Sequence, residues 1–278
     1  MAIRSPSLDA RPLVSRGFDG LGVSRLGVGT VKLGRNRRVK YPGGEGFALP
    51  SDRAIEILLD LALSCGINLI DTAPAYGVAE ERLGQLLGRR RDRFFLITKT
   101  GEEFVNGRSV YDFSAAHTRK SVERSLRRLR TAFLDCVMLH CSRDDLNVLS
   151  HTPALETLFR LKDEGKINHV GASTHTVEGG SLAAELSDCV MVAYNQNYTE
   201  QRPVIEYARR AGRAVFVKKG LDSGHVGAFD DLAENICFIV NTPGVTSLIF
   251  GSINPDHIRE NVQVLTARGR VGGHYSDT

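Results

Sequence analysis

Short apolar runs alternate with longer amphipathic stretches from about residue 23 to about residue 262 of this chain. A continuous apolar run is typical of a buried strand, whereas apolar residues spaced three and four apart are typical of a helix. The apolar runs predict strands at VSRLGVGT (23–30), INLIDT (67–72), RFFLITKT (93–100), FLDCVMLHC (133–141), INHVGAST (167–174), CVMVAYN (189–195), AVFVKKG (214–220) and TSLIFG (246–251).

A helix is predicted after each of these strands. Ser51 is a candidate N-cap and Gly66 a candidate C-terminal stop for the first helix. Thr152 is a candidate N-cap for another, with Pro153 at its first position. The helices are predicted at 52–66, 79–88, 114–130, 153–165, a stretch containing 181–187, 203–212, 231–241 and 255–265.

Strand–helix units in this number predict a closed (β/α)₈ TIM barrel. A doubly wound open sheet is the main alternative, but it usually carries G-x-G-x-x-G after its first strand, and no such motif follows here. The 278 residues, 42% of them hydrophobic, suffice for one such barrel. We therefore expect a single domain over residues 1–278 with its core at about 21–263, a short N-terminal lead and a mobile C-terminal tail, GRVGGHYSDT.

The charge balance argues against a nucleic-acid surface. Lys and Arg number 36 against 32 acidic residues, and the net charge of +4 is spread along the chain. The N-terminal MAIRSPSLDA lacks the apolar core of a secretory signal, and no apolar run reaches the ~18 residues of a membrane span. These features predict a soluble, cytoplasmic protein that acts on a small molecule and binds neither nucleic acid nor membrane; they do not indicate its oligomeric state.

The cysteines predict reduced, buried thiols. They are odd in number and form no C-x-x-C pair: Cys65, Cys136, Cys141, Cys189 and Cys237. Cys141 follows His140 directly, but adjacent strand residues point to opposite faces, which disfavours a nucleophile–base pair.

Polar, titratable residues follow three successive apolar runs. Asp71 and Tyr76 lie in LIDTAPAYG, Lys99 in FFLITKTG and His140 in CVMLHCS. The carboxyl ends of parallel barrel strands meet at one rim, so these four residues are predicted to share one active site. Each also has a structural interpretation: a strand-end turn for Asp71, a loop aromatic for Tyr76, a solvated strand end for Lys99 and a core imidazole for His140.

The four residue types suit proton transfer to a developing alkoxide. A tyrosine keeps its proton at neutral pH and can donate it as a general acid. Lys99 would favour the phenolate left on Tyr76, Asp71 would keep Lys99 protonated and oriented, and His140 would donate to the substrate oxygen.

On these motifs the chain resembles the aldo-keto reductase family, over approximately residues 20 to 265. The family pattern D-x-x-x-x-Y-G corresponds to DTAPAYG, T-K-x-G to TKTG, and L-H to Leu139-His140. The resemblance implies a (β/α)₈ barrel that reduces carbonyl groups with a nicotinamide cofactor, with catalytic roles on Asp71, Tyr76, Lys99 and His140.

The resemblance also implies cofactor contacts. The G-x-G-T motif reads GVGT here, V-G-x-S reads VGAS, and the segment after the last strand reads GSINPDHIREN. Asn254 would cap a helix that begins at Pro255, so free backbone N–H groups would face a phosphate. By resemblance, the cofactor contacts fall on Gly29, Thr30, Ser173, Ser252, Glu260 and Asn261.

The sequence departs from the family at several of these contacts. Gly251 and His257 stand where the motif has lysine and arginine, which weakens the usual clamp on an NADP 2′-phosphate; NADPH is expected, with NADH not excluded. Met191 replaces a glutamine, whose carboxamide contact Asn195 could partly supply. Lys218 stands where many members have a stacking tyrosine, and Lys218 or Lys219 could reach the cofactor pyrophosphate as a point charge.

The predicted function is reversible hydride transfer between NADPH and the carbonyl of an aldehyde, ketone or sugar, with Tyr76 as general acid or base. Two alternatives stay open: a Schiff-base aldolase that uses Lys99, Lys218 or Lys219, and a cofactor-binding regulatory subunit without significant turnover. The substrate and the physiological direction are not readable from the sequence. Loops 34–50 and 102–113 would shape the substrate site. The first of these loops contains a basic segment, which could meet an acidic group of the substrate or simply be an exposed loop: Arg35, Arg37, Arg38 and Lys40.

Overall fold

The computed structural model describes residues 14–15, 22–38, 46–220 and 229–268 of the chain. Parallel strands close into a barrel in the order β3-β4-β5-β8-β9-β10-β11-β12, with β12 pairing back to β3. The predicted (β/α)₈ barrel is thus confirmed. Its strands are β3 (Leu26–Gly29), β4 (Leu69–Asp71), β5 (Phe95–Thr100), β8 (Leu134–His140), β9 (Ile167–Ser173), β10 (Cys189–Ala193), β11 (Ala214–Lys218) and β12 (Ser247–Phe250).

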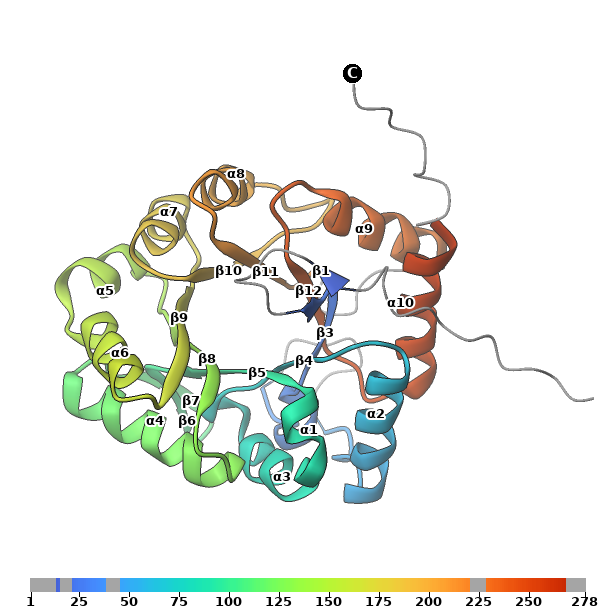
Figure 1. Ribbon diagram of the computed structural model, residues 1–278, viewed down its shortest axis with the longest axis horizontal. Helices are drawn as coiled ribbons and strands as arrows, with labels where there is room; N and C mark the ends of the chain where they lie inside the picture. Colours follow the sequence, from blue (N-terminus) through green and yellow to red (C-terminus); the bar gives the residue numbers. More distant parts are fainter. Residues whose placement is uncertain (1–13, 16–21, 39–45, 221–228, 269–278) are drawn as a thin grey trace, which may run out of the picture.

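Helices surround the barrel on its outside (Figure 1). They are α1 (Val31–Gly34), α2 (Asp52–Ser64), α3 (Ala79–Leu86), α4 (Ala115–Leu129), α5 (Asp145–His151), α6 (Ala154–Asp163), α7 (Val177–Leu186), α8 (Arg202–Arg210), α9 (Phe229–Asn241) and α10 (Pro255–Arg268). Ser51 caps α2 as predicted, since its side chain accepts from the Ala54 N–H, and Gly66 follows the helix with a φ of 76°.

One predicted helix start is wrong. Thr152 does not cap α6, whose N-cap is Pro153 and whose first residue is Ala154. Thr152 instead belongs to the end of α5, a helix that the sequence analysis did not predict, and its hydroxyl donates to the carbonyl of Val148 at 2.7 Å. The hydroxyl is therefore engaged with the preceding helix, and α6 has no side-chain hydrogen bond at its N-cap.

The barrel strands have two buried faces, as parallel strands do. Side chains on the outer face pack against the helices, and alternate side chains fill the barrel interior. The interior cluster comprises Val23, Leu69, Phe95, Ile97, Cys136, Met138, Cys189, Met191, Ala214, Phe216 and Ile249.

Two hairpins and two short helices complete the described chain. β1 (Val14–Ser15) pairs with β2 (Val23–Ser24) just before β3, and β6 (Glu102–Val105) pairs with β7 (Arg108–Tyr111) just after β5. The 3₁₀ helices η2 (Pro74–Tyr76) and η3 (Gly88–Arg93) follow β4 and α3. The N-terminal lead and the tail 269–278, whose mobility the sequence predicts, lie outside the described residues, apart from β1.

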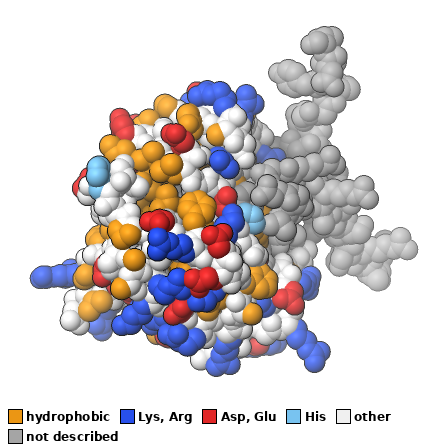
Figure 2. Space-filling model, turned by 60° about the vertical axis from the view of Figure 1, so that its left-hand side comes forward, with side chains coloured by type: hydrophobic (Ala, Val, Ile, Leu, Met, Phe, Trp, Pro, Cys, Tyr) orange, Lys and Arg blue, Asp and Glu red, His pale blue; other side chains and the backbone are white. Residues whose placement is uncertain are grey.

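The outer surface carries mixed charge. Figure 2 shows basic and acidic side chains interspersed on one face of the molecule. On α4, Arg119 pairs with Glu164 and Arg128 pairs with Glu81. The basic run of this helix is thus partly neutralised by neighbouring acids. Within the residues that the structure describes, no helix is both long and apolar enough to cross a bilayer.

Candidate active site

The inner face of the barrel changes from apolar to polar at the carboxyl ends of its strands. Every second residue of a strand points into the barrel. On β4, β5, β8 and β11 these inward residues are apolar along the strand and polar at its carboxyl end. Strand register places neighbouring ends side by side: Gly29 is opposite Asp71, and His140 is opposite Ser173. The polar residues reached in this way are Asp71, Lys99, His140, Ser173 and Lys218.

Lys99 and Asp71 form a buried ion pair at this rim. The Lys99 Nζ donates to Asp71 Oδ1 at 2.5 Å and to the carbonyl of Thr72 at 2.9 Å. The side chains are 1% and 6% exposed. Thr30, a predicted cofactor contact, supports Asp71 from β3, because its hydroxyl and its backbone N–H both donate to the Asp71 carbonyl at 3.0 Å. The ammonium is therefore fixed in position from inside the barrel.

Tyr76 reaches the same rim from η2. The Lys99 Nζ lies 4.9 Å from the centroid of its ring, and the His140 ring lies 6.3 Å away in an edge-to-face arrangement. The turn that carries Tyr76 is held against α1 by glycines, since a Cβ on Gly34 would lie 2.3 Å from the Tyr76 carbonyl oxygen, and Gly77 has a φ of 65°. The structure thus brings together the four residues that the sequence singled out.

Glu102 joins this group, although the sequence analysis did not select it. Its Oε2 lies 2.7 Å from His140 Nδ1, and its Oε1 accepts from the Ser109 hydroxyl at 2.5 Å. Burial opposes the charge on Glu102, but His140, Ser109 and the positive charge of Arg35 outweigh it and lower the pKa of this carboxyl to about 2. Burial is also the main influence on His140 and lowers the pKa of its imidazole, while Glu102 acts in the opposite direction.

A sequence signal for this arrangement existed. Asn106-Gly107 is a dipeptide typical of two-residue hairpin turns, and both residues have positive φ, 50° and 77°. The flanking segments pair as β6 and β7, in the loop expected to shape the substrate site. The hairpin places the first residue of β6, Glu102, beside the end of β8.

Lys218 lies in the same polar layer, beside Ser173. Its Nζ donates to Ser173 Oγ at 2.8 Å and to the Thr174 carbonyl at 3.1 Å. Burial, then the charges of Lys219 and Lys99, lower the pKa of Lys218 to about 8. Ser173, predicted to contact the nicotinamide, thus already has a partner, while Lys219 is exposed and has a φ of 56°.

Asn195 is engaged within its own loop. Its Nδ2 donates to the Lys219 carbonyl at 3.0 Å and its Oδ1 accepts from the Asn197 N–H at 2.9 Å. These bonds close the loop after β10 and use one of the two N–H groups of the amide, and the expected contact with the cofactor amide stays a prediction. Met191 itself packs in the barrel interior.

The segment after β12 has the predicted capped form. Asn254 Oδ1 accepts from the Asp256 N–H at 3.0 Å, and α10 begins at Pro255. Ser252 Oγ lies 3.0 Å from His257 Nδ1. The other predicted contacts here are Gly251, which is exposed, Glu260, which is partly buried, and Asn261, which is buried and has no partner for Oδ1 in the part of the chain that the structure describes.

This end of the site accords with a phosphate-bearing cofactor. The N-terminus of α10 offers backbone donors to an anion. Asn261 Oδ1 meets no hydrogen-bond donor among the described residues and is a buried acceptor that an amino group could satisfy. On β3, Gly29 packs closely against β12, because a Cβ there would lie 3.3 Å from the Ile249 side chain.

The cysteines are free, as predicted, and Cys65, Cys136, Cys141 and Cys189 are buried while Cys237 is partly buried. Cys141 packs on the outer face of the barrel, where burial and Asp145 raise the pKa of its thiol to about 12. It is therefore neither ionised nor directed at His140.

Within the basic segment, Arg35 is held against backbone carbonyls. Arg35 donates to the carbonyls of Ala75 and Arg38, and its guanidinium lies 3.7 Å from the Phe104 ring centroid. Arg37 and Arg38 are exposed, and Lys40 lies outside the described residues. Arg35 thus connects α1, η2 and the hairpin around the site.

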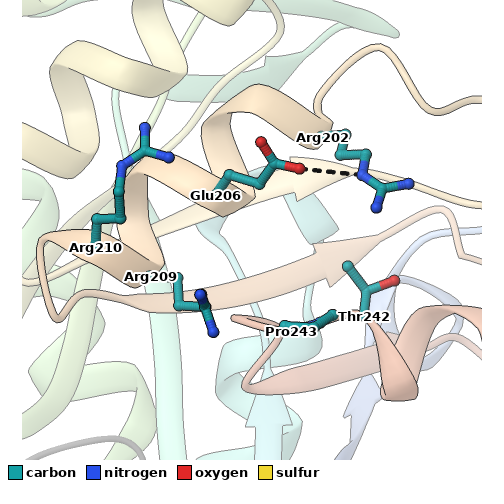
Figure 3. A pocket seen from close by; sticks show the side chains of 6 residues that line it. All are labelled: Arg202, Glu206, Arg209, Arg210, Thr242 and Pro243. Atoms are coloured by element: carbon teal, nitrogen blue, oxygen red, sulfur yellow. Dashed lines mark hydrogen bonds and ion pairs between the residues drawn. The ribbon is translucent and has the colours of Figure 1, made fainter.

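A separate hollow lies on the outside of the barrel, between α8 and the end of α9 (Figure 3). It has a volume of about 240 Å³ and is lined by arginines of α8 together with Glu206, Thr242 and Pro243. Arg202 and Glu206 pair across one helical turn at 3.1 Å. Its charged surface residues are remote from the strand ends, so it is not part of the candidate active site.

Known proteins resemble the chain in both sequence and structure. The model of the Aldo/keto reductase family matches residues 25–237. A solved Pseudomonas aeruginosa structure assigned to the aldo-keto reductases is 46% identical, with a TM-score of 0.82, and the match covers 92% of this chain and 94% of that one.

Two curated relatives match over most of their length. The oxidoreductase YqkF of Bacillus subtilis, itself uncharacterised, is 25% identical over 294 residues, which cover 91% of this chain and 90% of that protein. Pyridoxine 4-dehydrogenase of Escherichia coli is 27% identical over 267 residues, which cover 86% and 88%. The chain belongs to the aldo/keto reductase family, whose members are NAD(P)H-dependent oxidoreductases.

Proposed function

We propose that this enzyme interconverts a carbonyl compound and the corresponding alcohol, with Tyr76 as general acid in reduction and general base in oxidation. The observation that carries the proposal is the buried Lys99–Asp71 pair, whose ammonium lies 4.9 Å from the Tyr76 ring centroid. A fixed positive charge near a phenol stabilises the phenolate that remains after proton donation. NADPH supplies the hydride when it is bound.

The cofactor would lie along the rim from the polar layer to α10. Gly29, Thr30 and Ser173 line its expected course near the strand ends, while Ser252 precedes α10 and Glu260 and Asn261 lie in the second turn of that helix. Ser173 holds Lys218 in the described structure, so a carboxamide there would share or displace that ammonium. His257 can donate to a phosphate, although an imidazole holds it less firmly than a guanidinium does.

The substrate class that we propose is an aldehyde, a ketone or a sugar, or the matching alcohol. The relative named pyridoxine 4-dehydrogenase supports including alcohols. The Schiff-base alternative is weakened at Lys99, because a Schiff-base lysine has to lose its proton whereas Lys99 forms an ion pair with Asp71.

The test is Tyr76→Phe, which removes the donated proton and keeps the ring. We expect kcat for reduction with NADPH to fall by about 10²–10⁴-fold, the usual contribution of a positioned general acid, with the Kd for NADPH unchanged. Tyr207→Phe, on the outer helix α8, is the matched control and should keep full activity. Full activity of Tyr76→Phe would remove Tyr76 from the mechanism.

A further inference from the structure

Lys218 brings a positive charge into the polar layer without a counter-ion of its own. Its Nζ donates to Ser173 Oγ at 2.8 Å and to the Thr174 carbonyl at 3.1 Å, and both acceptors are uncharged. Among the described residues no carboxylate forms an ion pair with this ammonium, whereas Lys99 is paired with Asp71. Because burial lowers the pKa of Lys218 only to about 8, most of the side chain is charged at pH 7.

A nicotinamide ring that reacts beside Tyr76 would lie close to this ammonium. Hydride transfer requires contact between the ring and the carbonyl carbon, whose oxygen would meet Tyr76 at the rim. Lys218 belongs to the same polar layer, where its charge acts on His140 and the charge of Lys99 acts on it. Its direct partner Ser173 is also the predicted contact of the nicotinamide carboxamide.

We propose that the ammonium of Lys218 makes the site bind the reduced cofactor more tightly than the oxidised one, and thereby favours carbonyl reduction at neutral pH. The nicotinamide ring is uncharged in NADPH and carries one positive charge in NADP⁺. Two like charges in a partly buried site repel each other, because little water screens them. The inference rests on the proposed function in that the ring reacts beside Tyr76.

Several charged or titratable groups surround Lys218. They are Asp71 on β4, Lys99 on β5, His140 on β8, Cys141 and His175 just after β8 and β9, and Lys219 just after β11. Burial lowers the pKa of both imidazoles, that of His175 to about 4, and raises the pKa of the Cys141 thiol to about 12. These three groups are therefore uncharged where Lys218 titrates, and the pair of Lys99 with Asp71 adds no net charge.

The preference for NADPH should weaken as Lys218 loses its proton. Below its pKa of about 8 the side chain is charged and opposes NADP⁺, and above this pKa it is neutral and does not. The ratio of the Kd for NADP⁺ to the Kd for NADPH should therefore fall as the pH rises. Between about pH 7 and about pH 9.5 we expect a fall of about 5- to 10-fold, since a neighbouring like charge shifts a pKa by about one unit and each unit is a factor of ten.

The test measures this ratio in the full-length protein without substrate. The chain contains no tryptophan, so the fluorescence of NADPH itself reports its binding without interference from indole. The Kd for NADP⁺ follows from the displacement of bound NADPH. Both constants are measured at several pH values, and their ratio cancels any effect that a variant has on the two cofactor forms alike.

Two substitutions separate the charge of Lys218 from its shape. Lys218→Met removes the charge and keeps a long side chain, so it should lower the ratio at pH 7 by about 5- to 10-fold and remove its pH dependence. Lys218→Arg keeps the charge at every assay pH, so its ratio should stay high in the alkaline range.

Lys120→Met is the matched control. Lys120 is an exposed residue of α4 on the outside of the barrel, so its replacement removes the same net charge away from the rim. The ratio and its pH dependence should equal those of the unaltered protein.

A ratio that does not change with pH in the unaltered protein would overturn the inference, as would equal ratios for Lys218→Met and Lys120→Met. If Lys218→Met does not fold, the pH profiles of the unaltered protein and of Lys218→Arg decide the matter. A ratio that depends on Lys218 in a protein that turns over neither carbonyls nor alcohols would contradict the proposed function alone. Turnover that depends on Tyr76, with a ratio that ignores Lys218, would contradict this inference alone.

Discussion

Replacing Asp71 by asparagine should destabilise the protein strongly. The substitution keeps the shape of the side chain but removes the counter-ion of Lys99, whose ammonium is 1% exposed. Removing one member of a buried ion pair costs about 3–5 kcal/mol, because the remaining charge has lost its counter-ion and has little contact with water. For a chain of this size each 1 kcal/mol lowers Tm by roughly 2–4 °C, so we expect a loss of about 6–20 °C.

A double-mutant cycle isolates the charge from other effects. Asp71→Asn combined with Lys99→Met leaves no charge buried without a partner, so the double variant should regain most of the stability lost in the single one. Asp60→Asn is the matched control, since Asp60 forms an equally short pair with Arg90 at 2.5 Å but is 58% exposed. Exposed pairs contribute about 0.2–1 kcal/mol, and the control should lose no more.

The assay is urea unfolding followed by circular dichroism at about pH 7, with a reductant present for the free cysteines. The difference in the free energy of unfolding between variants is the measured quantity. Equal losses in Asp71→Asn and Asp60→Asn would refute the reasoning, because burial would then make no difference. Additive losses in the double variant would equally show that the two charges are not coupled.

Two further predictions concern stability. Burial and then Lys219 lower the pKa of Lys218 to about 8, whereas a lysine of the unfolded chain has a pKa of 10.5. At pH values between these two, the unfolded chain binds more protons than the folded protein does. Stability should therefore rise with pH across this window, and Lys218→Met should flatten the rise in urea unfolding; parallel profiles would contradict this. Gly84→Ala should lose about 1–3 kcal/mol, because the new Cβ would lie 1.9 Å from the Arg128 carbonyl oxygen and force α3 from α4. The exposed neighbour Gln85→Ala is its control, and equal melting temperatures for the two variants would show that the helices do not touch there.

The barrel and the position of its polar layer follow from periodicity alone. Apolar strand runs separated by amphipathic helices predict the closed sheet, and the carboxyl ends of its strands meet at one rim. On β5, Phe95, Ile97 and Lys99 alternate with residues of the opposite face. Once the strands are predicted, their order and alternation are enough to predict that Lys99 and Asp71 lie close together.

Contacts between distant segments were less accessible to sequence reasoning. Lys218 donates to Ser173, 45 residues away in the sequence, and the run AVFVKKG does not indicate which of its two alternating faces turns inward. The barrel decides this, because Ala214 and Phe216 fill its interior and Lys218 lies on the same face of the strand. The local hydrogen bonds of Asn195 to Lys219 and Asn197 were likewise not predicted from the sequence.

The protonation state of His140 shows why a residue's position does not determine its role. Strand alternation predicts that the ring points into the barrel, but it does not specify which nitrogen carries the proton. The charges around the ring bear on this, and among them Glu102 comes within 2.7 Å of Nδ1 because the Asn106-Gly107 turn folds β6 and β7 back beside β8. The hairpin therefore does more than shape a wall of the substrate site, since Glu102 opposes the effect of burial on the pKa of His140. A substitution in the turn that left every predicted catalytic residue in place would still change the electrostatics of the site.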